Sequence, residues 1–172
     1  MTEFDTIDFD RVSKIQADID NNAKKLDSII SEIIKPYCED LDNYVEFIKS
    51  VLEDNSNPPT AQELDDFCMN LSMYIYYASS MQEQLGIKDD IAKSVYKDMY
   101  HSARYSQEKG TVADKDTIAE LASQQEYITS ICYKRAYSIV KAKVSAAQEL
   151  LTSCKKVISR RMSEYELTHF NM

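Results

Sequence analysis

The near absence of glycine and proline constrains the fold of this chain more than any other feature. Only two Gly and three Pro occur in 172 residues. A β-sandwich or barrel needs turn residues roughly every 8–12 positions, so both are nearly excluded. Rossmann and P-loop sites need clustered glycines and are excluded as well. Because apolar residues make up 44% of the chain, enough for a packed core, we expect an all-α protein.

Residues 9–54 carry an apolar seam typical of a coiled coil. Its members alternate by three and four positions: Val12, Ile15, Ile19, Asn22, Leu26, Ile29 and Ile33. Asn22 either lies buried, where it would fix register or oligomeric state, or faces solvent while Ala23 continues the seam. The pattern resumes after Pro36, which removes a backbone donor and should kink or end a helix. We therefore predict one long helix kinked at Pro36, or two helices in line.

The clearest break in the chain lies at residues 55–59, where two prolines follow Asn and Ser. Residues 60–63 have the pattern of a capping box and predict the start of a second helix. Gly86 is a natural left-handed stop for that helix. A third helix is expected from about Asp89 to near Gly110.

The last segment, from about Asp114 to Glu166, contains neither Gly nor Pro. As one helix it would be roughly 80 Å long, longer than any compact bundle the other segments could form. We expect its surplus to be buried by a partner, a second copy or a bound polymer. The predicted fold is one helical domain over residues 1–172, an elongated antiparallel bundle or coiled coil. It consists of an acidic helical segment (1–55) and a helical core (60–166).

Charge is distributed unevenly along the chain. Residues 1–66 hold 17 acidic and 6 basic residues, whereas residues 130–162 hold eight basic residues against Glu149. The overall charge of −9 therefore conceals a basic final helix. Its basic residues are Lys134, Arg135, Lys141, Lys143, Lys155, Lys156, Arg160 and Arg161.

A polar stripe with cations at intervals follows the three-four spacing of this last helix. Its members are Lys134, Ser138, Lys141, Ser145, Gln148, Thr152, Lys155 and Ser159. Tyr127, Tyr133 and Tyr137 stand beside it or on its flank. Cations that follow phosphates and aromatic rings that stack on bases are the combination that holds single-stranded nucleic acid. The candidate contacts are Tyr133, Lys134, Arg135, Tyr137, Lys141, Lys155, Lys156, Arg160 and Arg161.

Two structural interpretations of the basic helix compete with nucleic-acid binding. The stretch could be a solvated face, or it could pair with the acids of residues 1–66 in an antiparallel bundle. The tyrosines would then be core residues whose polar tips reach its edge.

Enzymatic, metal and membrane functions find little support in the sequence. The four cysteines are scattered and predict reduced, mostly buried thiols in a cytosolic protein. The two histidines (His101 and His169) each follow an acid by three positions, but further core glutamates of a di-iron bundle are missing. No run of about 18 apolar residues occurs, and residues 1–5 lack the features of a secretory signal. We predict a cytoplasmic protein with no enzymatic activity, cofactor, metal or membrane span.

The later part of the chain, about residues 64–165, resembles the UvsY-type recombination mediators of tailed phages. The resemblance rests on Tyr100-His101-Ser102-Ala103-Arg104-Tyr105 with Gly110 after it, and on the stretch from Leu150 to Arg161. That stretch reads Leu-Leu-Thr-Ser-Cys-Lys-Lys-Val-Ile-Ser-Arg-Arg. The family's proteins are small and helical, assemble into rings, bind single-stranded DNA and help to load a RecA-like recombinase. The resemblance implies that Arg104, Lys155, Lys156, Arg160 and Arg161 contact DNA.

The sequence thus favours a non-enzymatic, phage-encoded, self-associating protein that binds single-stranded nucleic acid or acts as a recombination mediator, with single-stranded DNA as the expected partner. One alternative is an acidic protein that binds a protein partner through residues 1–66 and imitates nucleic acid, as an inhibitor of a defence enzyme would. Another is a structural or scaffold-like helical phage protein.

Overall fold

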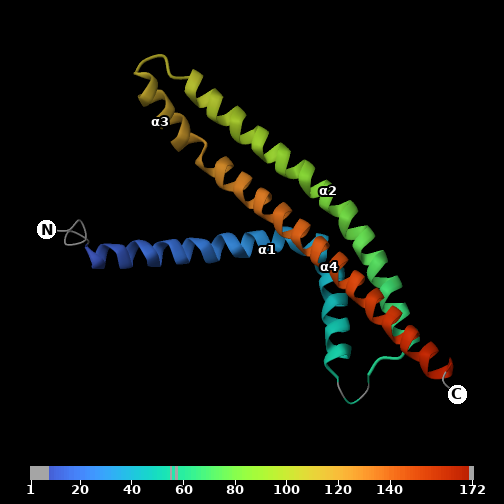
Figure 1. Ribbon diagram of the computed structural model, residues 1–172. Helices are drawn as coiled ribbons and strands as arrows, with labels where there is room; N and C mark the ends of the chain where they lie inside the picture. Colours follow the sequence, from blue (N-terminus) through green and yellow to red (C-terminus); the bar gives the residue numbers. More distant parts are fainter. Residues whose placement is uncertain (1–7, 55, 57, 171–172) are drawn as a thin grey trace.

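Four α-helices make up the part of the chain that the computed structural model describes, residues 8–54, 56 and 58–170, with side chains up to residue 163. They are α1 (Phe9–Glu53), α2 (Ala61–Tyr105), α3 (Val112–Ala122) and α4 (Gln124–Phe170). These residues include no strand, so the all-α prediction is confirmed. The molecule is elongated: α2 and α4 lie side by side, while the first half of α1 projects away from them (Figure 1).

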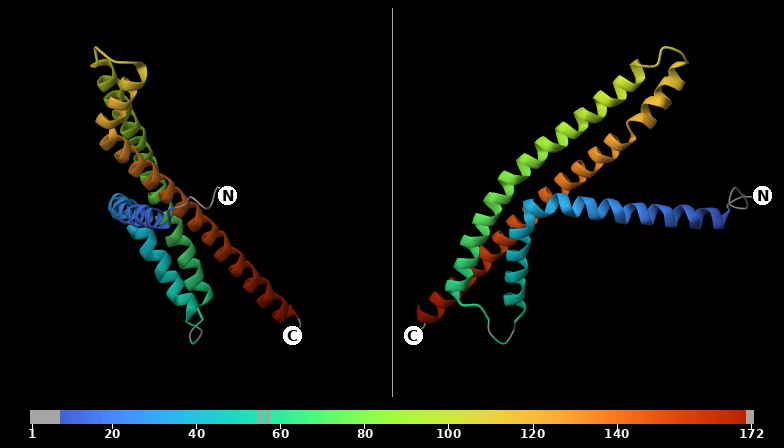
Figure 2. Two further views of the ribbon diagram at one scale, coloured as in Figure 1. Left: turned by 90° about the vertical axis from the view of Figure 1, so that its left-hand side faces the viewer. Right: turned by 180° about the vertical axis from the view of Figure 1, so that it is seen from behind.

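The antiparallel pair of α2 and α4 is the main axis of the molecule (Figures 1 and 2). Its buried residues include Leu71, Ile75, Ala78 and Leu85 of α2 and Ala136, Val140, Val144 and Ala147 of α4. The two helices have 45 and 47 residues, so each is roughly 70 Å long. We expected the last helix to exceed any partner within the chain. That expectation is wrong, because α2 is nearly as long as α4.

Gly86 lies inside α2, which continues without a break from Ala61 to Tyr105, so the predicted stop at this glycine is wrong. A glycine inside a helix costs only about 1 kcal/mol relative to alanine, which packing can offset. The ring of Tyr137 from α4 lies 3.3 Å from the position that a Cβ at residue 86 would occupy. The glycine therefore allows α4 to approach α2 closely at this point.

The last helical segment is divided at Ser123, into α3 and α4, rather than forming one helix from Asp114. Thr111 and Asp114 form a capping box that starts α3. The buried hydroxyl of Ser123 donates to the carbonyl of Ala119 at 2.7 Å. This side-chain bond to the preceding turn satisfies the hydroxyl at the point where the chain leaves one helix and enters the next.

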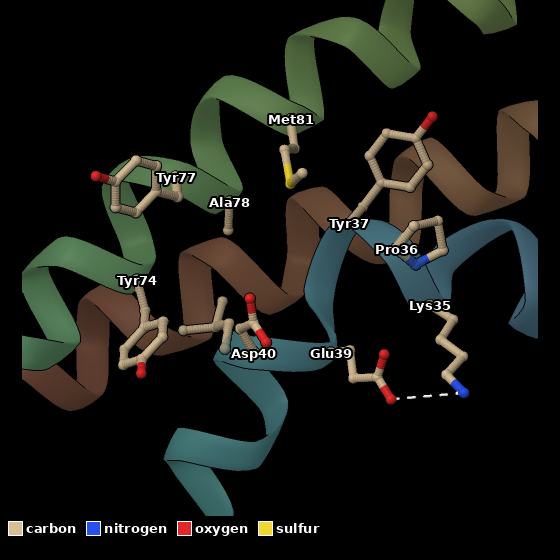
Figure 3. Close-up of a pocket in the computed structure, with 10 residues that line it drawn as sticks. Lys35, Pro36, Tyr37, Glu39, Asp40, Tyr74, Tyr77, Ala78 and Met81 are labelled. Atoms are coloured by element: carbon tan, nitrogen blue, oxygen red, sulfur yellow. Dashed lines mark ion pairs between the residues drawn. The ribbon is translucent and has the colours of Figure 1, made fainter.

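α1 is a single helix that passes through Pro36, which confirms the first of the two predicted arrangements. It bends near its middle (Figures 1 and 2), and Figure 3 places Pro36 at this bend. Proline explains the bend because its ring clashes with the preceding turn and no N–H is available for the helix. After α1, Thr60 and Glu63 form the predicted capping box that starts α2.

The two halves of α1 have different surroundings. We call residues 9–29 the arm and residues 30–53 the bundle half. In the bundle half, Leu41 and Ile48 are 3% and 1% exposed, and the ring of Tyr44 packs 4.8 Å from that of Tyr74 in α2. In the arm, Ile15 and Ile19 are 50% and 60% exposed. The same apolar spacing is therefore buried in one half of the helix and exposed in the other.

Candidate nucleic-acid interface

The orientation of α4 follows from its apolar residues. Ala136, Val140, Val144 and Ala147 recur at helical spacing and are buried in the core. The predicted polar stripe lies elsewhere on the helix, and all eight of its members from Lys134 to Ser159 are exposed. This part of the sequence prediction is confirmed.

Five basic side chains on the exposed surface of α4 have no ion-pair or hydrogen-bond partner among the described residues. They are Lys134, Arg135, Lys141, Lys155 and Lys156, and we call them the cation face. Between Lys134 and Lys156 the helix rises by roughly 33 Å. Glu149 is the acidic residue of α4 in this interval, so the potential along the face is positive.

Three other basic residues of α4 are engaged within the chain: Arg160 and Arg161, which were predicted contacts, and Lys143, which was not. The guanidinium of Arg161 donates to the backbone carbonyl of Pro59 at 2.9 Å, and Arg160 is not free either. Lys143 donates to both carboxylate oxygens of Asp42 in α1, at 2.7 and 2.8 Å. These contacts fix the start of α2 and the bundle half of α1 against α4.

Arg104 lies far from the cation face, near the end of α2. Its Nε is 2.6 Å from Oδ1 of Asp116 in α3, and the Tyr100 hydroxyl donates to the same oxygen at 3.1 Å. Burial of the Tyr100 hydroxyl, and to a smaller extent its hydrogen bond to Asp116, raises the pKa of Tyr100 above its ordinary value. The structure thus places Arg104 in a contact that joins α2 to α3.

Tyr133 and Tyr137 are half-buried and pack against the core. The Tyr137 ring lies 3.3 Å from the place that a Cβ at residue 86 would occupy, and Tyr133 lines a hollow with Ile91 and Val95. Rings held in this way cannot present both faces to a base. The site that the structure brings together consists mainly of cations. Of the three tyrosines beside the stripe, Tyr127 is 49% exposed, and its ring packs 5.2 Å from that of Tyr96.

The acidic residues of the first segment are not spread evenly over it. Residues 8–35 hold six acidic and five basic residues, whereas residues 36–66 hold nine acidic residues and Lys49. The arm projects away from α4 (Figure 1), so its acids lie apart from the cation face. Asp42 is an acid of α1 that does pair with α4.

The structure also shows how the four thiols and one surface hollow between α1 and α2 are arranged. All four cysteines are free and buried, and burial, with Asp42 nearby, raises the pKa of Cys38 to about 11. A hollow of about 400 Å³ lies between α1 and α2. Figure 3 shows Tyr37 and Met81 among the residues that line it. Its rim carries an ion pair between Lys35 and Glu39, at 3.5 Å. Among the side chains that the structure describes, up to residue 163, no three His, Cys, Asp or Glu could hold a metal ion together.

Comparison of the chain with protein families, curated proteins and solved structures finds no match. The resemblance to phage recombination mediators therefore stays a prediction. No helix among the described residues combines the length and hydrophobicity needed to cross a lipid bilayer.

Proposed function

We propose that this protein binds single-stranded nucleic acid, without catalysis, through the cation face of α4. The observation that carries the proposal is the set of five exposed cations spread over roughly 33 Å of one straight helix. None of the five has an ion-pair or hydrogen-bond partner among the described residues. Phosphate contacts of this kind give affinity without reading sequence. Ser145, Gln148 and Ser159 of the stripe are exposed and offer donors to phosphate oxygens. The hydroxyls of Ser138 and Thr152 already donate to backbone carbonyls of the preceding turn.

A straight row of charges favours a flexible strand over a duplex. The backbone of B-DNA winds once around its axis in about 34 Å, nearly the length of the cation face. A rigid duplex therefore brings each strand close to the row over only part of its length. A single strand can follow the whole row, and we expect it to bind more tightly than the duplex.

The test is replacement of Lys134, Lys141, Lys155 and Lys156 by Ala, followed by fluorescence anisotropy with a labelled oligonucleotide. We expect affinity for the single strand to fall by roughly tenfold or more at low salt. In the native protein, log affinity should decrease with log salt with a slope of about −3 for four phosphate contacts on a single strand. The variant should show a clearly shallower slope.

A matched control variant carries the same change in net charge at other exposed lysines: Lys14, Lys24, Lys97 and Lys109 to Ala. It should bind the oligonucleotide as the native protein does. Equal affinities of the native protein and the α4 variant would reject the cation face as a binding site. Equal losses in the two variants would show that only overall charge matters.

A second candidate function is supported by the acidity of residues 36–66, which hold nine acidic residues and Lys49. Most of these carboxylates are exposed, including Glu39, Asp40 and Glu46. A surface of this kind would bind a basic protein and imitate nucleic acid. It predicts that the native protein leaves the oligonucleotide unbound, and that neutralising the α4 lysines changes nothing in the anisotropy assay.

A further inference from the structure

The arm carries an apolar seam that is left uncovered by the described part of the chain. Val12, Ile15 and Ile19 are exposed, as is Ile29 near the end of the arm. Water therefore meets an apolar strip over about five helical turns, interrupted at Asn22. A lone helix with such a strip gains stability when another helix covers it.

One flank of this seam carries charges that alternate in sign. Arg11, Asp18, Lys25 and Glu32 recur every seven residues, and each lies one position before a residue of the seam. All four side chains are exposed and have no ion-pair partner among the described residues. Positions beside a coiled-coil seam set the choice and orientation of the partner helix.

The opposite flank is uncharged. It consists of Phe9, Gln16, Ala23 and Ile30, again at intervals of seven residues. In an antiparallel pair of helices, the charged flank of one helix lies beside the charged flank of the other, and the uncharged flanks meet likewise. In a parallel pair, each charged flank would meet an uncharged one.

We propose that two copies of this protein pair through their arms, antiparallel, about a two-fold axis between Asp20 and Asn21. In this register Asp18 faces Lys25 of the other copy, and Arg11 faces Glu32 of the other copy. By symmetry the pairing forms four contacts between opposite charges and none between like charges. A two-fold interface requires such self-complementarity, because each contact occurs twice.

The seam residues also match in this register. The layers are Val12 with Ile29, Ile15 with Leu26, and Ile19 with Asn22 of the other copy. Each layer except the one with Asn22 is wholly apolar. On the uncharged flanks, Gln16 meets Ala23, and Phe9 lies beside Ile30, which packs partly against the core of its own copy.

Other arrangements of the arms lose this complementarity. A shift by one heptad in one direction places Asp18 against Asp18 and Arg11 against Lys25. A shift in the other direction places Lys25 against Lys25 and Asp18 against Glu32. A parallel pair in register has no opposite charges across its seam, since Asp18 would face Ala23. The charges therefore select one orientation and one register.

The size of the interface determines how strongly we expect the two copies to associate. Residues 12–29 form a helix of about 27 Å, and such a short pair buries less than the standard area of about 800 Å² per partner. The dimer should be weak, with a dissociation constant in the micromolar range. The inference is independent of nucleic-acid binding, because the cation face lies on α4 and not on the arm.

The decisive experiment exchanges the charges of one pair in the full-length protein. In Asp18→Lys, residue 18 would repel Lys25 of the other copy, and in Lys25→Asp, residue 25 would repel Asp18. Sedimentation equilibrium at low ionic strength should show roughly ten- to thirtyfold weaker self-association for each single variant. The double variant Asp18→Lys/Lys25→Asp should dimerise within about threefold of the native protein.

Mixing the two single variants is a second measurement, because their charges are complementary in the antiparallel register. The mixture should form a heterodimer with native affinity although neither variant dimerises well alone. The matched controls Asp20→Lys and Lys24→Asp change the same charges on the arm's outer surface and should dimerise as the native protein does. Circular dichroism verifies that all variants keep native helicity.

Three outcomes would overturn the proposal. One is a native protein that stays monomeric at the highest attainable concentration. Another is self-association of the single variants at native strength, which would point to a parallel pair or to a different surface. The third is self-association of the double variant and of the mixture that is as weak as that of the single variants. Direct contact between residues 18 and 25 of two copies requires that both restore the association.

Discussion

The arm and the bundle half of α1 belong to one helix and share one apolar spacing, but the apolar side chains are mostly exposed in the arm and mostly buried or half-buried in the bundle half. Leu41 and Ile48 are buried against α2 and α4, whereas Ile15 and Ile19 face water. Packing begins at Ile30, before the bend at Pro36. Periodicity therefore identifies the face of a helix that needs a partner, but not which part of that face the rest of the chain covers.

The largest effect should come from shortening a buried side chain in the bundle half. Leu41→Ala should lower the free energy of unfolding by about 2–5 kcal/mol, because it leaves a cavity in the core. Ile19→Ala in the arm should change it by less than about 0.5 kcal/mol when the protein is dilute and monomeric. Urea denaturation followed by circular dichroism measures both. Similar losses at the two positions would mean that the arm is packed in solution.

A second contrast concerns Cys38 in the bundle half, whose pKa is raised by burial from 9.0 to about 11. A raised thiol pKa means that the folded state favours the neutral thiol. The contribution of this thiol to the free energy of unfolding is therefore fully present below pH 9 and is lost between pH 9 and 11. The loss should amount to about 2 kcal/mol. The free energy of unfolding of the native protein should fall over this range more steeply than that of Cys38→Ala. Parallel curves for the two proteins would contradict this assignment.

Removing the bend at Pro36 should bring the exposed arm alongside α2, so that it would resemble the bundle half. Pro36→Ala supplies an N–H for the helix and removes the ring clash, so α1 should straighten and carry the arm along the second half of α2. Spin labels at Ser13→Cys and Lys97→Cys should then lie closer together than in the protein with Pro36. Stability should change by no more than about 1 kcal/mol. An unchanged distance would show that the bend has another cause.

The smallest effect should come from the ion pair that joins the bundle half to α4. Asp42 and Lys143 lie 2.7 Å apart, and their side chains are 43% and 38% exposed. Asp42→Asn should therefore cost about 0.2–1 kcal/mol. In a double-mutant cycle with Lys143→Ala, the coupling should vanish at high salt. A coupling that persists there would mean that the pair is more deeply desolvated than its exposure indicates.

Local sequence signals predicted much of the fold because they act over a few residues. The capping box at Thr60, the kink at Pro36 and the polar stripe of α4 all depend on neighbours within one or two turns. Gly86 was misinterpreted because its role depends on Tyr137, a residue of another helix. The division at Ser123 was missed because helix-forming residues on both sides leave no local signal, and its buried hydroxyl becomes evident only in the fold.

The candidate site shows the same limit. The spacing of the stripe predicted which side chains of α4 share an exposed surface, from Lys134 to Ser159. It could not predict which cations are already engaged, since the partners of Lys143 and Arg161 lie about a hundred residues away in the chain. Nor could it distinguish exposed tyrosines from half-buried ones such as Tyr133, because both occur at the edge of an apolar face.

The bend at Pro36 has a consequence for how two copies would use their α4 surfaces. Because it directs the arm away from α2 and α4, a pair joined through the arms would hold its two bundles apart with neither cation face covered. A long strand bound to one copy would then meet the second at a high effective concentration. Such avidity can exceed the affinity of a single surface by orders of magnitude, so a few lysines on each copy would suffice for tight binding.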